Sequence, residues 1–173
     1  YKYASDKTAK AVWGTNKYTL SFDTDGGSAV TSKEVTFNVA IGSLSTPTKT
    51  GYTFAGWTID GENIDADATY KYTSNKTAKA TWTANTYTLS FDTDGGNTIS
   101  SKTVTYNSAI GTLSTPTRAG YTFTGWYKDA ELTEAYDFTT MPAENVTVYV
   151  GWSINEYTIS FVENGGSVVE DIK

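Results

Sequence analysis

The sequence predicts tandem small domains that are mostly β-structure, and three observations predict it. First, the segment Tyr18–Trp57 recurs at Tyr87–Trp126, and 11 of the 40 aligned positions differ, which leaves 29 identical. Second, apolar and polar residues alternate in several short segments, which is the period of a strand with one buried face. Third, the 173 residues include 13 Tyr, seven Phe and five Trp, and aromatic residues favour strands.

The repeats also mark the expected domain boundaries. We expect complete copies at residues 18–86 and 87–156. Residues 1–17 carry the end of a preceding copy, because YKYASDKTAKAVW resembles the YKYTSNKTAKATW that ends at Trp82, and residues 157–173 start a further copy with YTISFVENGGSVV. The chain is therefore expected to be a window of a tandem array, an arrangement that spaces or stacks units more often than it builds a catalytic site.

The first copy opens with a predicted hairpin. In Tyr18–Asp23, Leu20 and Phe22 point to one face and the polar residues to the other. The following Asp-Thr-Asp-Gly-Gly supplies residues that tolerate positive φ, so the chain is expected to turn there. Lys33–Phe37 resumes the alternation and is predicted to be the second strand.

A short helix is predicted over Asn38–Leu44. Ile41 and Leu44 lie three positions apart, and Asn38 can cap the first turn. Pro47 then ends it, because the residue before a proline is pushed out of the helical region.

The second half of the copy predicts two more strands. The segment GYTFAGW at Gly51–Trp57 is the first, and Trp57 falls on its outer face unless a bulge at Gly56 re-aims it. Ile59–Thr69 is polar and variable between copies, so a loop is expected, and Thr77–Trp82 closes the copy as a strand. Hairpin, short helix and further strands predict an α+β, mostly β domain of the β-grasp (ubiquitin-like) kind. All-β sandwich repeats are the alternative if the helix is only a turn.

Composition excludes several classes of function. The net charge of −6 argues against nucleic-acid partners and against anionic membrane surfaces. The chain has no Cys and no His, so thiol chemistry and sites that need imidazole are excluded. No apolar run approaches the roughly 18 residues of a membrane helix, so no membrane insertion is expected in this segment. No nucleophile–base pair or metal set is recognisable, so we expect neither an enzyme nor a cofactor.

The motifs YT-x-SF-x-x-x-GG and P-T-[K/R]-x-GYTF-x-GW, followed by the closing Trp82 or Trp152, resemble the Listeria–Bacteroides repeat, the family of the internalin B B-repeat. The resemblance implies a β-grasp-like module, repeated in bacterial proteins that are secreted or held at the cell wall. It implies a role in adhesion or as a stalk that presents an adhesive domain. The family offers no catalytic residues to carry over.

Three sets of residues are candidates for a site. Asp23-x-Asp25-Gly26 and its copy at Asp92 resemble the start of a calcium loop, but the downstream glutamate is missing and Val162 replaces the first ligand in the third copy, so no metal is expected. The aromatic residues of GYTFAGW could stack on sugars, but their place in the strand favours the core. Lys33 with Asn38 lacks a consistent acid for an isopeptide bond.

Exposed contact residues are the remaining candidates. Tyr127 and Tyr149 lie out of phase with the expected core, so we predict that they are exposed and able to contact a partner. The sequence thus favours a non-catalytic stalk whose immediate partners are the neighbouring repeats. Its joint of Thr83–Thr86, without glycine or proline, predicts a semi-rigid rod. The alternative is a binding module that recognises a host-surface protein or glycan through loops and tyrosines.

Overall fold

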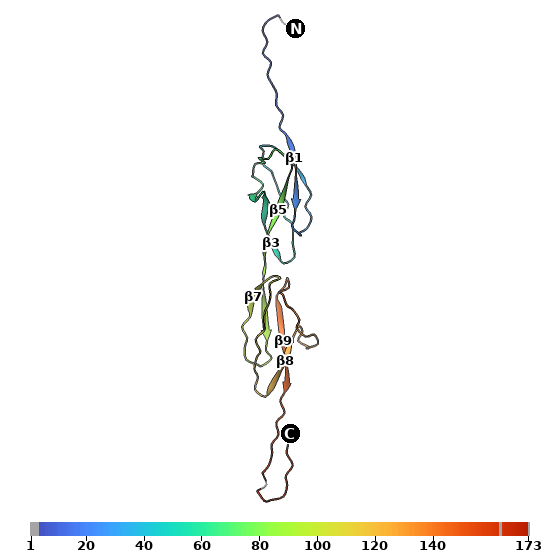
Figure 1. Ribbon diagram of the computed structural model, residues 1–173, viewed down its shortest axis with the longest axis vertical. Helices are drawn as coiled ribbons and strands as arrows, with labels where there is room; N and C mark the ends of the chain where they lie inside the picture. Colours follow the sequence, from blue (N-terminus) through green and yellow to red (C-terminus); the bar gives the residue numbers. More distant parts are fainter. Residues whose placement is uncertain (1–3, 163, 173) are drawn as a thin grey trace. The chain divides into compact units, whose positions relative to one another are not determined.

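The computed structural model describes residues 4–162 and 164–172. The chain divides into two compact units, with the boundary between Thr83 and Ala84 (Figure 1). Each unit holds one mixed sheet, and the described residues contain no helix.

The first unit contains a five-stranded sheet in the order β2-β1-β5-β3-β4. Its first and last strands run parallel at the centre of the sheet, with Phe22 beside Ala78, and β1–β2 and β3–β4 are antiparallel pairs. The strands are β1 (Lys17–Asp23), β2 (Lys33–Thr36), β3 (Tyr52–Ile59), β4 (Glu62–Ile64) and β5 (Lys76–Ala84).

The second unit repeats this arrangement with four strands in the order β7-β6-β9-β8. Again the first and last strands are parallel neighbours, with Phe91 beside Val148. The strands are β6 (Thr86–Asp92), β7 (Lys102–Thr105), β8 (Tyr121–Tyr127) and β9 (Val146–Ile154).

The predicted helix over Asn38–Leu44 is wrong, and so is the α+β class that depended on it. Asn38 and Gly42 adopt left-handed φ values of 59° and 76°, which a helix does not contain. The backbone N–H groups of this segment donate to a neighbouring loop instead, from Asn38 to Tyr70 O at 2.9 Å and from Ile41 to Ala68 O at 2.9 Å. Seven residues are too few for a helix to resist such tertiary bonds.

The all-β part of the alternative prediction is confirmed, whereas its sandwich is wrong because each unit has one sheet. Part of the expected loop Ile59–Thr69 is also a strand. Asp60 and Gly61, both at positive φ, form a two-residue turn that joins β3 to β4. The predicted strands at the other positions are confirmed to within a few residues.

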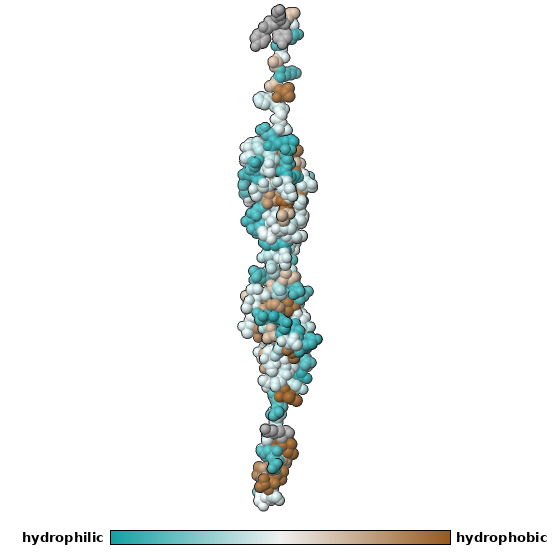
Figure 2. All heavy atoms as spheres, turned by 90° about the vertical axis from the view of Figure 1, so that its right-hand side faces the viewer, coloured by the Kyte–Doolittle hydropathy of each residue, from teal (hydrophilic) through white to brown (hydrophobic). Residues whose placement is uncertain are grey.

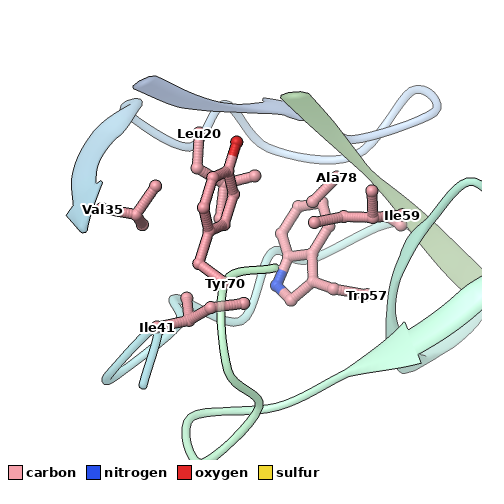
Figure 3. Packing of buried hydrophobic residues seen from close by; sticks show 8 residues of the cluster. Leu20, Val35, Ile41, Trp57, Ile59, Tyr70 and Ala78 are labelled. Carbon is pink, nitrogen blue, oxygen red and sulfur yellow. The ribbon is translucent and has the colours of Figure 1, made fainter. Parts of the chain in front are cut away.

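One face of each sheet is covered by loops that supply core residues. In the first unit, Ile41 and Tyr70 come from loops and pack against Leu20, Trp57 and Ala78 of the strands (Figure 3). Figure 3 shows the Tyr70 ring with Leu20, Val35 and Ile41 around it. In the second unit, a smaller fully buried set is formed by Leu89, Ile110, Met141 and Val148.

The segments outside the two sheets expose apolar side chains. Trp13 is 90% exposed, and residues 4–16 contain no strand. After β9, Ile159 and Ile172 form an isolated antiparallel bridge, and Tyr157 and Val162 are exposed. Figure 2 shows apolar (brown) residues gathered on this last segment, whereas the drawn face of the two units is mostly polar.

Candidate functional site

The two tyrosines predicted as contact residues are neighbours on the outer face of the second sheet. Tyr127 of β8 and Tyr149 of β9 are cross-strand partners, and Asp92 of β6 flanks Tyr149 on its other side. Partners in register point to the same face of a sheet, while Val148 and Val150 point into the core. Both tyrosines are half-buried rather than fully exposed.

Tyr127 is half-buried because its ring lies over a glycine. A Cβ built on Gly151 would lie 2.5 Å from Tyr127 Cε2 and 2.4 Å from Thr124 Oγ1. Only a residue without a side chain leaves room for the ring there. Tyr127 therefore covers the sheet at Gly151.

Tyr149 lines a hollow of about 240 Å³ at the end of β6. The other residues that line it are Asp92 and Asp94, Ala130 and Leu132 of the loop after β8, and Val150. Leu132 has φ 57°, a left-handed conformation that is uncommon for a bulky residue. The hollow thus combines one aromatic ring, two carboxylates and an aliphatic wall.

A single carboxylate holds the loop beside the hollow. Asp129 accepts hydrogen bonds from the backbone N–H of Thr133 at 2.9 Å and of Glu134 at 2.8 Å, and also from the Thr133 hydroxyl. The hydrogen bond from the Thr133 backbone is the largest cause that lowers the pKa of the Asp129 carboxyl below its ordinary value. Lys128, at the start of the loop, pairs with Asp137 at 2.7 Å.

The first unit carries different residues at the same place. Lys79 stands where the second unit has Tyr149, and its Nζ lies 3.5 Å from Asp25 Oδ1. Thr58 and Thr81 stand where the second unit has Tyr127 and Gly151, and their hydroxyls donate to backbone carbonyls of the neighbouring strand. In the first unit a lysine and two threonine hydroxyls therefore occupy the positions of the two tyrosines and the glycine.

The repeated Asp-Thr-Asp-Gly-Gly segment is a turn held by its own side chains. Asp23 Oδ1 accepts the N–H of Asp25 at 3.0 Å, and Asp25 has φ 50°. The second glycine, Gly27, is needed for a different reason, since a Cβ there would lie 2.6 Å from the ring of Trp82. Trp82 also donates from Nε1 to Thr24 O at 3.1 Å, so the closing strand is fastened to the first turn.

A basic residue binds this turn from the Pro-Thr-[Lys/Arg] segment. Lys49 donates to Asp25 O at 2.7 Å, and its Nζ lies 4.7 Å from the centre of the Tyr52 ring. Arg118 does the same in the second unit, bonding Asp94 at 2.7 Å and stacking 4.0 Å from the Tyr121 ring. Among the described residues, no three His, Cys, Asp or Glu side chains come together in a way that could hold a metal ion.

The aromatic residues of the GYTF-x-GW motif serve the core. Gly56 has φ 146°, and in the second unit the β8–β9 register shifts between Phe123 and Gly125. In the second unit this bulge precedes Trp126, and in both units the tryptophan after the glycine packs with the core. Trp57 is 2% exposed and donates from Nε1 to Ser45 O at 2.9 Å, while Trp126 is half-buried against the second core.

The lysine considered for an isopeptide bond has another role. Lys33 Nζ donates to Ile41 O at 2.7 Å and to Ser43 O at 2.9 Å, and Lys102 likewise bonds Ile110 O. The lysines thus tie the loop after the hairpin to the sheet. In the described part of the chain, no helix is long and apolar enough to cross a membrane.

The sequences of both units match a known family. The model of the Listeria-Bacteroides repeat domain matches residues 18–81 and again residues 87–150. The chain belongs to the Listeria–Bacteroides repeat family. The resemblance found in the GYTF-x-GW motifs is thereby confirmed.

Several curated proteins contain similar repeats. A "Putative membrane protein" of Evansella cellulosilytica is 40% identical over 96% of this chain, and a "Putative Gly-rich membrane protein" of that species is 39% identical over 95%. "Internalin H" of Listeria monocytogenes is 39% identical over 82%. The chain spans 26%, 19% and 26% of the lengths of these relatives, and their names are consistent with a surface repeat region.

Sequence reasoning singled out Tyr149 as a candidate, a prediction that remains untested, and gave no sign of the hollow beside it. It gave no role to Leu132 or to Gly151, and it read Asp92 only as a possible metal ligand. A position-by-position comparison of the two copies contains the missing signal, since Lys79 becomes Tyr149 and Thr81 becomes Gly151.

Proposed function

We propose that this chain is a non-catalytic spacer segment of a bacterial surface or secreted protein, which extends and presents an adhesive domain. The observation that carries the proposal is the recurrence of one small fold with almost no linker between copies. β5 ends at Ala84 and β6 begins at Thr86. Chain that enters a new sheet so soon has few free dihedral angles, so the joint is expected to be stiff.

The repeats at residues 18–86 and 87–156 are the proposed units of the array. Support comes from the family matches within both ranges and from the common strand arrangement. We also propose that the unit is a β-grasp sheet whose helix is replaced by loops. The parallel first and last strands at the centre of the sheet, flanked by antiparallel strands, support this relationship.

Small-angle X-ray scattering tests the spacer role. Chains with two, four and six copies of the repeat are compared, and a maximum dimension that grows nearly in proportion to copy number is expected. A matched series with a Gly-Ser insertion after Asn85 is the control for a flexible joint. Growth closer to the square root of copy number in the unmodified series would overturn the proposal of a stiff spacer.

A second candidate function is binding by the array itself to a host-surface protein or glycan. The observation that favours it is the hollow beside Tyr149, because at the equivalent place in the first unit Lys79 stands instead of the tyrosine and pairs with Asp25. A spacer alone does not require this difference between repeats.

A further inference from the structure

We propose that the hollow beside Tyr149 binds a neutral sugar residue, and that the second unit binds while the first does not. This inference deepens the binding candidate above and is independent of the spacer role. It rests on the size of the hollow, the chemistry of its walls and the contrast between the two units.

The size of the hollow suits a single sugar ring. Its volume of about 240 Å³ corresponds to roughly eight water molecules at the volume of liquid water. Pockets for drug-sized ligands are larger, about 300–1,000 Å³. A monosaccharide at the end of a glycan enters such a space, whereas a folded protein surface or a long peptide does not.

The walls offer both kinds of contact that a sugar needs. A pyranose has an apolar C–H face, which packs on an aromatic ring or an aliphatic side chain, and hydroxyl groups at its rim. Tyr149 and Leu132 provide the apolar surface, and Leu132 is held there by a left-handed backbone at 39% exposure.

The carboxylates supply acceptors for sugar hydroxyls. One oxygen of Asp92 accepts the Asp94 N–H at 3.1 Å, and one oxygen of Asp94 pairs with Arg118 at 3.1 Å. Within the described part of the chain, the other oxygens, Asp92 Oδ2 and Asp94 Oδ1, have no hydrogen-bond partner in the protein. Hydroxyl-to-carboxylate hydrogen bonds are short and strong.

The same charges select against acidic sugars. A sialic acid or uronic acid would bring a third carboxylate against Asp92 and Asp94, and among the described residues Arg118 is the one cation that pairs with either of them. The ligand class is therefore a neutral hexose or N-acetylhexosamine.

The first unit explains why the site is specific to one repeat. Its Asp25 is paired with Lys79 at 3.5 Å and with Lys49 at 3.7 Å, so its carboxylate is already neutralised. The joint from β3 to β4 is a tight turn at Asp60 and Gly61, so it has no counterpart of the Leu132 loop. The first unit is thus an internal control in the same molecule.

The test is a titration of the isotopically labelled full chain, followed by two-dimensional NMR, with four probes. The probes are methyl α-mannoside, methyl β-galactoside, N-acetylglucosamine and N-acetylneuraminic acid. We expect saturable amide shifts from at least one neutral sugar in the millimolar range, confined to residues 92–94, 130–132 and 148–150. The acidic sugar should bind at least tenfold more weakly, or not at all.

Two variants give the test a matched control. Tyr149→Lys rebuilds the pair found in the first unit and should abolish the shifts, while the remaining spectrum shows that the unit is folded. Thr147→Lys places the same charge two residues away on the same strand face and should retain binding. The proposal is overturned if none of the three neutral sugars gives saturable shifts at 100-fold molar excess and 50 mM or more, since roughly millimolar affinities are the weakest of interest. It is also overturned if equal shifts occur around Asp25 and Lys79. Binding that survives Tyr149→Lys would likewise overturn it.

Discussion

The packing of Tyr127 over Gly151 makes a sharp prediction about a single added methyl group. In Gly151→Ala the new Cβ would meet Tyr127 Cε2 at 2.5 Å and Thr124 Oγ1 at 2.4 Å. The Thr124 hydroxyl can rotate away, but the half-buried Tyr127 ring lies over the glycine and must be displaced. Overpacking of this kind costs about 1–3 kcal/mol.

A smaller opposing effect follows from the backbone. Replacing a glycine within a strand by alanine gains about 0.5–1 kcal/mol from reduced freedom of the unfolded chain. The net loss expected for Gly151→Ala is therefore about 1 kcal/mol, the middle of the two ranges. For a domain of this size, such a loss lowers the melting temperature of the second unit by roughly 4–8 °C.

The first unit supplies the compensating variant. It carries Ala55, Thr58 and Thr81 where the second unit carries Thr124, Tyr127 and Gly151. The single change Gly151→Thr should destabilise the second unit at least as much as Gly151→Ala. The triple change Thr124→Ala, Tyr127→Thr and Gly151→Thr transplants the packing of the first unit and should recover at least half of the loss.

Differential scanning calorimetry of the full chain measures the two melting temperatures, and hydrogen exchange with mass spectrometry assigns each transition to a unit. Hydrogen-exchange protection of the second unit should fall in Gly151→Ala and in Gly151→Thr, and it should return in the triple variant. Protection of the first unit should be unchanged in all three. If Gly151→Ala leaves the melting transition of the second unit unchanged, or if the triple variant is less stable than Gly151→Thr alone, the reasoning about this packing is refuted.

Four other outcomes are expected. Gly96→Ala should cost about 1–3 kcal/mol because its Cβ would lie 2.7 Å from the ring of Trp152, whereas Gly14→Ala, with open space around it, should leave calorimetry unchanged. Trp126→Ala should cost up to about 3–5 kcal/mol, the loss for a fully buried tryptophan, and an unchanged thermal midpoint would contradict its packing against the core. Because the pKa of Asp129 is lowered in the folded protein, its carboxylate stabilises the loop fully above the unfolded pKa of about 3.9, and this stabilisation is lost as the pH falls through the folded pKa. Over that acidic range, hydrogen exchange of the Thr133 amide, corrected for intrinsic rates, should accelerate. In Asp129→Ala the exchange should be fast at every pH and show no such acceleration. Titration with calcium should give no stoichiometric heat, and a micromolar site lost in Asp94→Ala would show that the turn is a metal loop.

The strands of each unit were predictable because their signal is local. Alternation in Tyr18–Asp23 and in Lys33–Phe37 depends only on which residues face the core, and the structure has strands there. The burial of Trp57 was also predictable. A large aromatic residue that falls out of phase directly after a glycine is typical of a bulge, and Gly56 has the positive φ that this requires.

The missing helix was not predictable from local sequence. The Asn38–Leu44 segment has a capping residue and apolar spacing suited to one helical turn, but its backbone bonds go to Ala68 and Tyr70, about 30 residues away. The positive φ of Gly42 favours this arrangement, although glycine alone does not specify it. Tertiary hydrogen bonds therefore decided the conformation of a segment too short to form a helix alone.

The changed loop between the copies was also hidden in the sequence. Asn38 and Asn107 make the same hydrogen bond, but the partner lies 32 residues on in the first unit (Tyr70) and 34 residues on in the second (Met141). One residue is then lost before Asn145, which bonds Thr88 as its counterpart does in the first unit. Relative to the first unit, the second unit thus has two residues added and one removed, and the sequence alone shows only the net difference of one residue.

This pair of length changes accounts for the difference between the two outer faces. In the first unit a tight turn connects β3 to β4, and the Tyr70 side chain is fully buried in the core. The second unit has Met141 there and a longer loop that carries Leu132 beside Tyr149. Duplication leaves one copy free to change while the other keeps the array folded. A spacer that consists of such copies can thus acquire a binding site in one repeat without loss of its reach, and the two proposed functions are compatible in a single chain.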